Sequence, residues 1–120
     1  MFDSEKTTIA QRTPRAEAIA QLNDKLRKTL RGGHFMVTRG VRSLPGFAAS
    51  DLIRAVATYD SFDADNDPHG ERDFGDVTLC GETLLWKIDY YDEHLQFASL
   101  DPADTSVTAR VLTVMLESEY

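Results

Sequence analysis

The densest group of side chains that could do chemistry lies between residues 60 and 76. It consists of seven carboxylates and one histidine: Asp60, Asp63, Asp65, Asp67, Glu71, Asp73, Asp76 and His69. The carboxylates at 63, 65 and 67 stand at alternate positions, as do the first three ligands of a calcium-binding loop. The match then fails, because Pro68 stands where that loop needs glycine and Phe74 where it needs a bidentate glutamate.

Two interpretations of this acidic segment stay open. One is a small metal-dependent enzyme or regulator, with an irregular cation site built from Asp63, Asp65, Asp67, His69 and Asp73. The other is a set of helix caps, Asx turns and solvated charges, which the Asn66-Asp67 and Asp67-Pro68 pairs favour.

His69 is a candidate general base, since neighbouring carboxylates orient an imidazole ring. The other two histidines, His34 and His94, show no spacing typical of metal ligands. We therefore expect His69 to face solvent, and we predict no catalytic residue, no bound metal and no cofactor.

Charge is divided unevenly along the chain. Residues 1–59 contain ten Lys and Arg and five acids, a net charge of +5. Residues 60–120 contain three bases and fifteen acids, a net charge of −12, which brings the chain to −7. If the two halves occupy different faces of the fold, one face is strongly acidic. Such a face suits a basic protein surface and opposes direct binding to nucleic acid.

The predicted protein-binding surface extends from the acidic segment to the strand that follows it. It comprises the seven carboxylates of residues 60–76 together with Asp89, Tyr91, Asp92 and Glu93. Trp86 and Tyr90 have the alternate spacing of buried strand residues, whereas Tyr91 falls on the opposite face.

A third possibility is a DNA-binding module that uses the basic side chains Lys25, Arg27, Lys28 and Arg31. A solvated helix face is the simpler interpretation of those four residues.

Composition indicates an ordinary globular protein of 120 residues, 42% hydrophobic and 28% charged. We expect a flexible segment at residues 1–13 and a single domain at residues 14–120. No basic segment followed by an apolar one occurs near residue 1, and no apolar run reaches the length of a membrane helix, so we expect a cytoplasmic protein without a membrane partner. The one cysteine, Cys80, is expected to be a small buried residue.

Local patterns predict an α+β fold. Thr13 and Pro14 predict the start of a helix that ends at Gly32-Gly33, and a second helix starts near Ser50. Strands are expected at 34–39, 77–79, 83–91 and 95–100, and a final helix at 101–115. We expect these elements to form an antiparallel sheet of three to four strands, with two or three helices packed on one face.

Five segments resemble a family of small bacterial proteins that is classified only as a domain of unknown function and is common on conjugative plasmids and integrative elements. They are residues 22–27, 37–41, 65–75, 86–92 and 111–116. The resemblance implies a mobile-element context and carries over no catalytic or binding residue. Small acidic proteins of such elements are often antirestriction or anti-CRISPR inhibitors. Together with the charge, this implies an inhibitor or adaptor that occupies a basic DNA-binding surface as a DNA mimic, for example on a nucleic-acid-binding subunit of a host defence complex.

Overall fold

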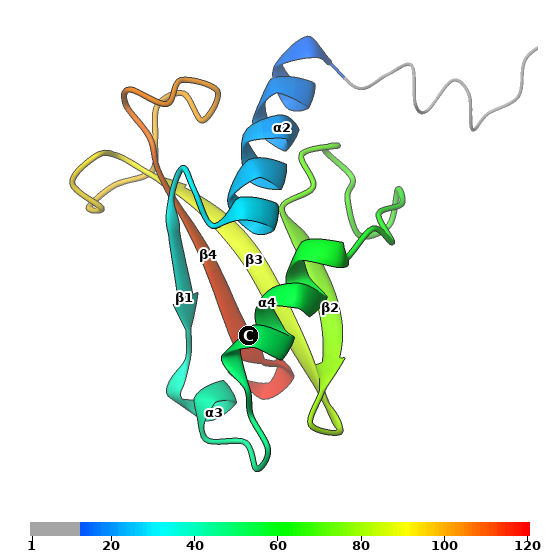
Figure 1. Cartoon of the computed structure of the whole chain (residues 1–120). Helices are drawn as coiled ribbons and strands as arrows, with labels where there is room; N and C mark the ends of the chain where they lie inside the picture. Colours follow the sequence, from blue (N-terminus) through cyan, green and yellow to red (C-terminus); the bar gives the residue numbers. More distant parts are fainter. Residues whose placement is uncertain (1–12) are drawn as a thin grey trace, which may run out of the picture.

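The computed structural model describes residues 13–120, in which a four-stranded sheet is covered on one face by two helices (Figure 1). The helices are α2 (Pro14–Thr29) and α4 (Ala49–Thr58), and the short helix α3 (Arg39–Arg42) lies at one end of the sheet. The strands are β1 (His34–Val37), β2 (Phe74–Leu79), β3 (Glu82–Tyr91) and β4 (Ala109–Leu116), and a short 3-10 turn, η1 (Glu117–Glu119), follows β4. The predicted α+β class is confirmed, whereas the predicted flexible segment lies outside the described residues apart from Thr13.

The sheet is mixed rather than antiparallel. Its strand order is β1-β4-β3-β2, in which β3 pairs antiparallel with both of its neighbours and β1 pairs parallel with β4. The prediction of an antiparallel sheet was therefore wrong for one pair. The reason is that the chain returns from the far edge of the sheet and inserts its last strand between β1 and β3.

That last strand occupies the segment for which a helix was predicted. Arg110, Leu112 and Val114 of β4 are buried at every second position, and they point toward the helices. The helix prediction was wrong because pairing with β3 and β1 on either side outweighs the helical spacing of the apolar residues. The strand predicted at 95–100 was also wrong, since these residues form a loop with a single bridge between Tyr91 and Ala98.

Helix α2 begins where the sequence predicts and ends slightly earlier. The Thr13 hydroxyl accepts a hydrogen bond from the Ala16 amide at 3.0 Å, as an N-cap does. The helix ends when Leu30 adopts the left-handed conformation, with φ of 62°. Gly33 follows the helix and lies against β4, where a Cβ atom would come within 2.6 Å of the Arg110 carbonyl oxygen. The glycine is therefore needed for close approach to the sheet.

Strands β2 and β3 form a hairpin whose two-residue turn is Cys80-Gly81. Both turn residues have positive φ, 54° and 76°. Cys80 is exposed, so the expectation that it is buried was wrong.

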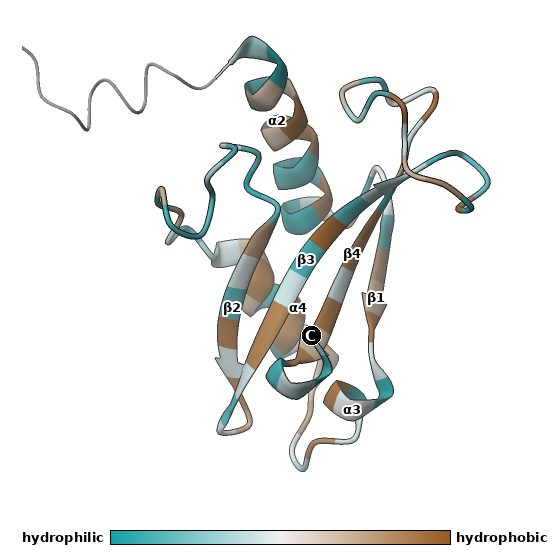
Figure 2. Ribbon diagram, turned by 180° about the vertical axis from the view of Figure 1, so that it is seen from behind, coloured by the Kyte–Doolittle hydropathy of each residue, from teal (hydrophilic) through white to brown (hydrophobic). Residues whose placement is uncertain are grey.

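The hydrophobic core lies between the helices and the inner face of the sheet. Its members include Leu26 of α2, Leu52 and Val56 of α4, and Leu84, Trp86 and Ile88 of β3. Figure 2 shows the apolar residues of the strands from behind and the hydrophilic loop at residues 60–73 beside α2. Within residues 13–120, no helix has both the length and the apolar character needed to cross a membrane.

Candidate functional site

Residues 60–73, here called the acidic loop, connect α4 to β2 and are held in one shape by side-chain to main-chain hydrogen bonds. Asp63 Oδ1 accepts from the amides of Asp65 and Asn66, at 2.9 and 3.0 Å. Asn66 Oδ1 accepts from the Asp63 amide at 3.0 Å, and its Nδ2 donates to the Ser61 carbonyl oxygen at 2.8 Å. These contacts are the Asx turns that the sequence favours.

The second half of the acidic loop turns inward. Asp67 is only 7% exposed, and its Oδ1 accepts a hydrogen bond from the Arg72 amide at 2.9 Å. Arg72 itself adopts the left-handed conformation, with φ of 53°. Asp67 therefore supports the backbone turn that brings the Arg72 side chain against α2.

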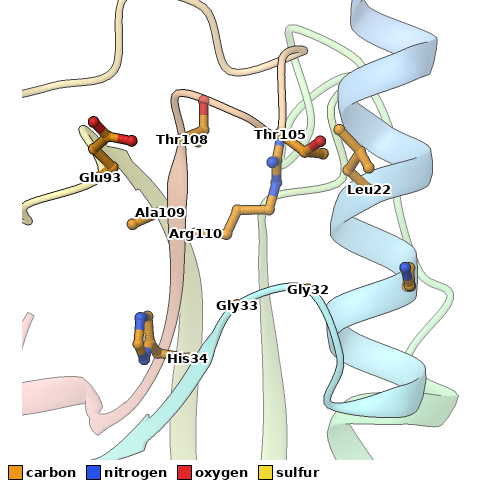
Figure 3. Close-up of a pocket in the computed structure, with 10 residues that line it drawn as sticks. Leu22, Gly32, Gly33, His34, Glu93, Thr105, Thr108, Ala109 and Arg110 are labelled. Atoms are coloured by element: carbon orange, nitrogen blue, oxygen red, sulfur yellow. The ribbon is translucent and has the colours of Figure 1, made fainter.

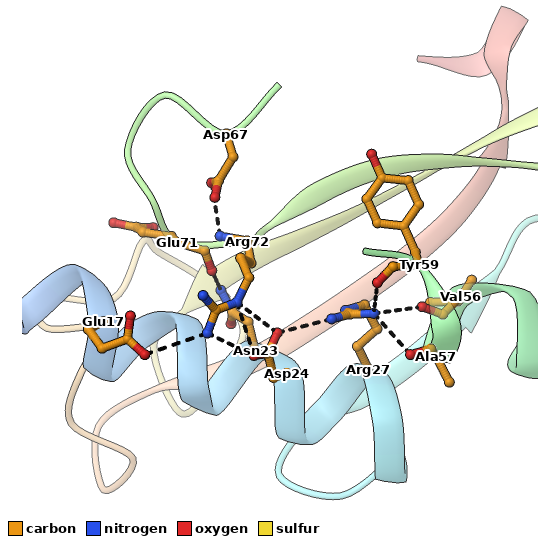
Figure 4. Close-up of polar contacts among 10 residues, drawn as sticks. All are labelled: Glu17, Asn23, Asp24, Arg27, Val56, Ala57, Tyr59, Asp67, Glu71 and Arg72. Carbon is orange, nitrogen blue, oxygen red and sulfur yellow. Dashed lines mark hydrogen bonds and ion pairs between the residues drawn. The ribbon is translucent and has the colours of Figure 1, made fainter. Parts of the chain in front are cut away.

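Asp24 of α2 binds two arginines and joins α2 to the acidic loop (Figure 4). Arg72 Nε lies 3.1 and 3.0 Å from its two carboxylate oxygens, and Arg72 Nη2 lies 2.8 Å from Oδ2. On the other side, Arg27 Nη2 donates to Asp24 Oδ1 at 3.0 Å. Asp24 is one of the few acids in the basic half of the sequence, and Arg72 is one of the few bases in the acidic half. Folding therefore pairs an acid from the basic half with a base from the acidic half.

Arg27 is 2% exposed, so it is a core residue and not part of a basic surface on α2. Its Nη1 donates to the carbonyl oxygens of Val56, Ala57 and Tyr59 at 3.0, 3.1 and 2.8 Å. Arg27 thus provides a hydrogen-bond donor for backbone carbonyl groups at the C-terminal end of α4. Its guanidinium carbon lies 5.3 Å from the ring centre of Phe62 and 5.6 Å from that of Trp86. Arg27 thus attaches α2 to α4 and to the start of the acidic loop.

A second polar chain crosses the inner face of the sheet. The Tyr90 hydroxyl donates to Glu71 Oε1 at 2.8 Å and accepts from Asn23 Nδ2 at 2.9 Å. Asn23 Oδ1 in turn accepts from Arg110 Nε at 2.8 Å.

Burial raises the pKa of the Tyr90 hydroxyl far above its ordinary value. Burial also raises the pKa of Asp73, and repulsion by Glu71 raises it further. Three of the predicted surface carboxylates, Asp67, Glu71 and Asp73, therefore belong wholly or partly to the interior.

The remaining acids of this region form a group on the outside, here called the outer carboxylates: Asp60, Asp63, Asp65 and Asp76. All four are exposed, and none forms an ion pair with another residue of the described chain. Burial raises the pKa of Tyr59, and the carboxylates of Asp76, Asp63 and Asp60 raise it further. These three carboxylates therefore lie within electrostatic range of the same hydroxyl.

The predicted residues of the later strand lie elsewhere. Asp89, half-buried on the face of the sheet opposite the helices, forms an ion pair with Lys87. The Asp92 carboxylate accepts hydrogen bonds from the amides of Gln96, His94 and Phe97, which lower its pKa. In both ribbon views, the loop after β3, which contains the exposed Glu93, and the acidic loop lie on opposite sides of α2 (Figures 1 and 2). The structure does not bring Tyr91, Asp92 and Glu93 together with the outer carboxylates.

Metal-binding geometry is absent from the described part of the chain. No group of three or more His, Cys, Asp or Glu side chains among residues 13–120 is arranged to hold a metal ion. Asp63 is used in the turn and Asp67 faces inward, whereas His69 is exposed, as expected.

A pocket of about 510 Å³ lies on the other side of α2, between the glycine turn after α2 and the loops that flank β4 (Figure 3). Its polar lining residues are Lys25, His34, Glu93, Thr105, Thr108 and Arg110. Sequence reasoning missed this pocket because Arg110 falls in the segment predicted as a helix. The one available signal was a single arginine in the otherwise uncharged run 109–116.

Comparison with known proteins identifies a family without assigning an activity. No curated protein and no solved structure matched the chain. A family described as "Protein of unknown function (DUF3768)" matches residues 37–119, which contain the acidic loop and strands β2, β3 and β4. The bacterial and mobile-element context stays a prediction. Because the match covers more than half of the chain, the protein belongs to the DUF3768 family.

Proposed function

We propose that the protein is a protein-binding inhibitor or adaptor that presents the outer carboxylates to a basic surface of a partner protein. The proposal rests on one combined observation: these carboxylates are exposed to solvent, and no basic side chain of the described residues neutralises their charge. Three of the four carboxylates, Asp60, Asp63 and Asp76, act on the hydroxyl of Tyr59 at the end of α4, and no basic side chain of the described residues pairs with any of the four. Basic side chains of a partner can therefore bind them without first breaking an internal ion pair.

The fixed shape of the acidic loop supports the same proposal. Two reciprocal contacts between Asp63 and Asn66 hold the first half, and the Asp24–Arg72 contact attaches the second half to α2. A loop that is already ordered loses less conformational entropy when it binds. The loop is thus suited to recognition of one partner surface.

The class of partner follows from the chemistry of the carboxylates. Negative groups spaced along a loop resemble the phosphates of a nucleic-acid strand, and they fit a groove lined with Lys and Arg. A basic DNA-binding subunit of a host defence complex is therefore the proposed target, and the protein acts as a DNA mimic of the antirestriction or anti-CRISPR kind. The family resemblance to proteins of mobile elements favours this choice.

The test compares two variants with the same change in net charge. The first replaces all four outer carboxylates with asparagine, and the Asp63→Asn change keeps a side-chain oxygen that can accept the hydrogen bonds of the turn. The control replaces four exposed acids elsewhere: Asp51→Asn, Glu82→Gln, Asp104→Asn and Glu117→Gln. Tagged wild-type protein and both variants are expressed in the source cells, and the recovered proteins are identified by mass spectrometry.

We expect a basic nucleic-acid-binding protein to accompany the wild type and the control but not the variant with four asparagines. With that partner purified, the affinity should decrease as salt rises, and DNA should compete with the wild-type chain. A partner that binds the asparagine variant as tightly as the wild type over a salt series would disprove the proposal.

A further inference from the structure

The pocket beside β4 contains a buried positive charge that no carboxylate of the described residues contacts directly, and Glu71 acts on it only through space. Arg110 is 2% exposed, and no carboxylate of the described chain lies within 4.0 Å of its guanidinium group. Its hydrogen bonds go to two neutral acceptors, Asn23 Oδ1 and the Pro102 carbonyl oxygen, and its Nη1 has no hydrogen-bond partner among residues 13–120. The other buried arginine, Arg27, by contrast, forms an ion pair with Asp24.

A buried charge without a counter-charge is unfavourable, and proteins usually pair such groups. Burial lowers the pKa of Arg110, and the charge of Glu71 offsets only part of this shift. The guanidinium carbon also lies 5.2 Å from the ring centre of Tyr90, a contact that holds the side chain in place. Figure 3 shows the side chain extending from β4 toward Leu22 of α2, below Thr105. Arg110 is thus an oriented cation at the wall of a pocket.

Other groups that line the pocket reinforce its positive character. Lys25 of α2 adds a second cation, His34 at the start of β1 adds an imidazole, and Glu93 is the one acid among the described lining residues. Thr105 adds a hydroxyl group, whereas the hydroxyl of Thr108 already donates to the Asp101 carbonyl oxygen. In a chain with a net charge of −7, a pocket with more basic than acidic side chains is unusual, and none of its described lining residues belongs to the acidic loop or to β2.

We infer that this pocket binds a small anionic molecule through a phosphate or carboxylate group, with Arg110 as the buried contact and Lys25 as the contact at the rim. Arg110 Nε and Nη2 already donate to Asn23 and Pro102, so the N–H groups of Nη1 are the donors left for an oxyanion, and the charge of the guanidinium group strengthens such a hydrogen bond. The volume of about 510 Å³ is that of a site for a small metabolite. This binding site is independent of the proposed binding of a partner protein.

The experiment is a titration of the full chain followed by ¹H–¹⁵N NMR. One series adds inorganic phosphate, a second adds citrate, and a third adds sodium chloride to the same ionic strength. We expect saturating shifts for the amides of Gly32, Gly33 and Thr105 and for Arg110 Nε–H, in the phosphate or the citrate series and not with chloride. The series that saturates at the lower concentration identifies the oxyanion class. Amides of the acidic loop should not shift, which separates this result from the proposed function.

Variants locate the site. Lys25→Ala should weaken binding about tenfold, the effect of losing one charge-assisted hydrogen bond. Lys28→Ala, on an exposed position of the same helix, should leave binding unchanged. Arg110→Lys, which keeps the charge but loses the hydrogen bonds to Asn23 and Pro102 that hold the side chain in place, should weaken binding more than Lys25→Ala. If that buried variant does not fold, the comparison of Lys25→Ala with Lys28→Ala decides the test. Shifts that chloride reproduces, or equal affinities of the Lys25 and Lys28 variants, would overturn the inference.

Discussion

At the scale of single residues, Arg27 shows how a charged side chain can act as a core residue. It comes from α2, satisfies three carbonyl oxygens around the end of α4, and lies against the rings of Phe62 and Trp86. Its charge is matched by Asp24, which also binds Arg72. One side chain therefore connects two helices, the sheet and the acidic loop.

Replacement of Arg27 by Met tests this role. Methionine fills similar space, but it leaves the carbonyl oxygens of Val56, Ala57 and Tyr59 without their donor. We expect the free energy of unfolding to fall by about 3 kcal/mol, the usual cost of removing one partner of a buried charged network. Urea denaturation measures the change. Lys28→Met, at the exposed neighbouring position, should change stability by less than about 0.5 kcal/mol, and a similar loss in both variants would contradict the role.

Asp73 predicts a dependence of stability on pH. Burial, and then repulsion by Glu71, raises its pKa, so the folded state binds a proton more readily than the unfolded state does. Stability therefore falls as pH rises from the unfolded pKa to the folded pKa, and the loss persists above that interval. Asp73→Asn removes the charge, so we expect this variant to be more stable than the wild type at neutral pH. The difference should vanish below the unfolded pKa of about 3.9.

Urea denaturation at several pH values checks this prediction, and Asp104 provides the control of opposite sign. Hydrogen bonds from Ser106 lower the pKa of Asp104, so its contribution to stability is present at neutral pH and is lost as pH falls. Asp104→Asn should therefore be slightly less stable than the wild type at neutral pH, with a gap that closes in acid. If Asp73→Asn showed no gain at neutral pH, the Asp73 carboxyl would not be destabilising.

At the scale of elements, local signals and pairing partners decide different parts of the fold. The cap formed by Thr13 and Pro14 depends on adjacent residues only, and the start of α2 was predicted correctly. Strand β4 depends on β1 and β3, which lie far away in the sequence. The apolar residues of this region fit the spacing of a helix at positions 107, 111, 114 and 115. They also fit the alternate spacing of a strand at positions 112, 114 and 116, so the sequence pattern alone could not distinguish a helix from a strand.

The same distinction explains what could be predicted of the candidate site. The Asx turns of the acidic loop involve residues two or three apart, and they follow from Asp63 and Asn66. The inward position of Glu71 depends on Tyr90 and Asn23, 19 and 48 residues away. Residue types therefore predict an acidic loop, whereas its division into inner and outer carboxylates required the tertiary structure.

The hairpin between β2 and β3 offers a stabilising substitution. Cys80 and Gly81 both have positive φ, and the first position of such a turn is best occupied by Asn. Because a cysteine is strained there and its side chain is exposed, we expect Cys80→Asn to raise the free energy of unfolding by about 0.5 kcal/mol. Cys80→Val should lower it, since a β-branched residue disfavours positive φ. Thermal and urea denaturation distinguish these outcomes, and a loss of stability in Cys80→Asn would show that the cysteine side chain has another role.

At the scale of the whole molecule, folding reduces the charge asymmetry of the sequence. Strand β1 from the basic half pairs with β4 from the acidic half, and Asp24 binds Arg72. What persists is local: the acidic loop and β2, which carry the outer carboxylates, lie on one side of α2, and β1 and the loops before β4, which line the pocket of Arg110, lie on the other. The molecule therefore presents two surfaces of different charge.

This distribution predicts how salt affects the isolated protein. Asp60, Asp63 and Asp76 lie around Tyr59 without a basic partner in the described residues, so they repel one another and destabilise the fold. Salt screens this repulsion, because the Debye length falls to about 4 Å near 0.5 M NaCl. We expect Asp60→Asn combined with Asp76→Asn to raise the melting temperature at low salt, and the gain to disappear at high salt.

The matched control, Asp51→Asn combined with Glu82→Gln, should give a smaller gain, since Asp51 is paired with Arg54 and Glu82 lies at the hairpin turn. Equal gains in the two variants would mean that repulsion is spread over the whole molecule, and the outer carboxylates would then have no concentrated field with which to attract a basic partner.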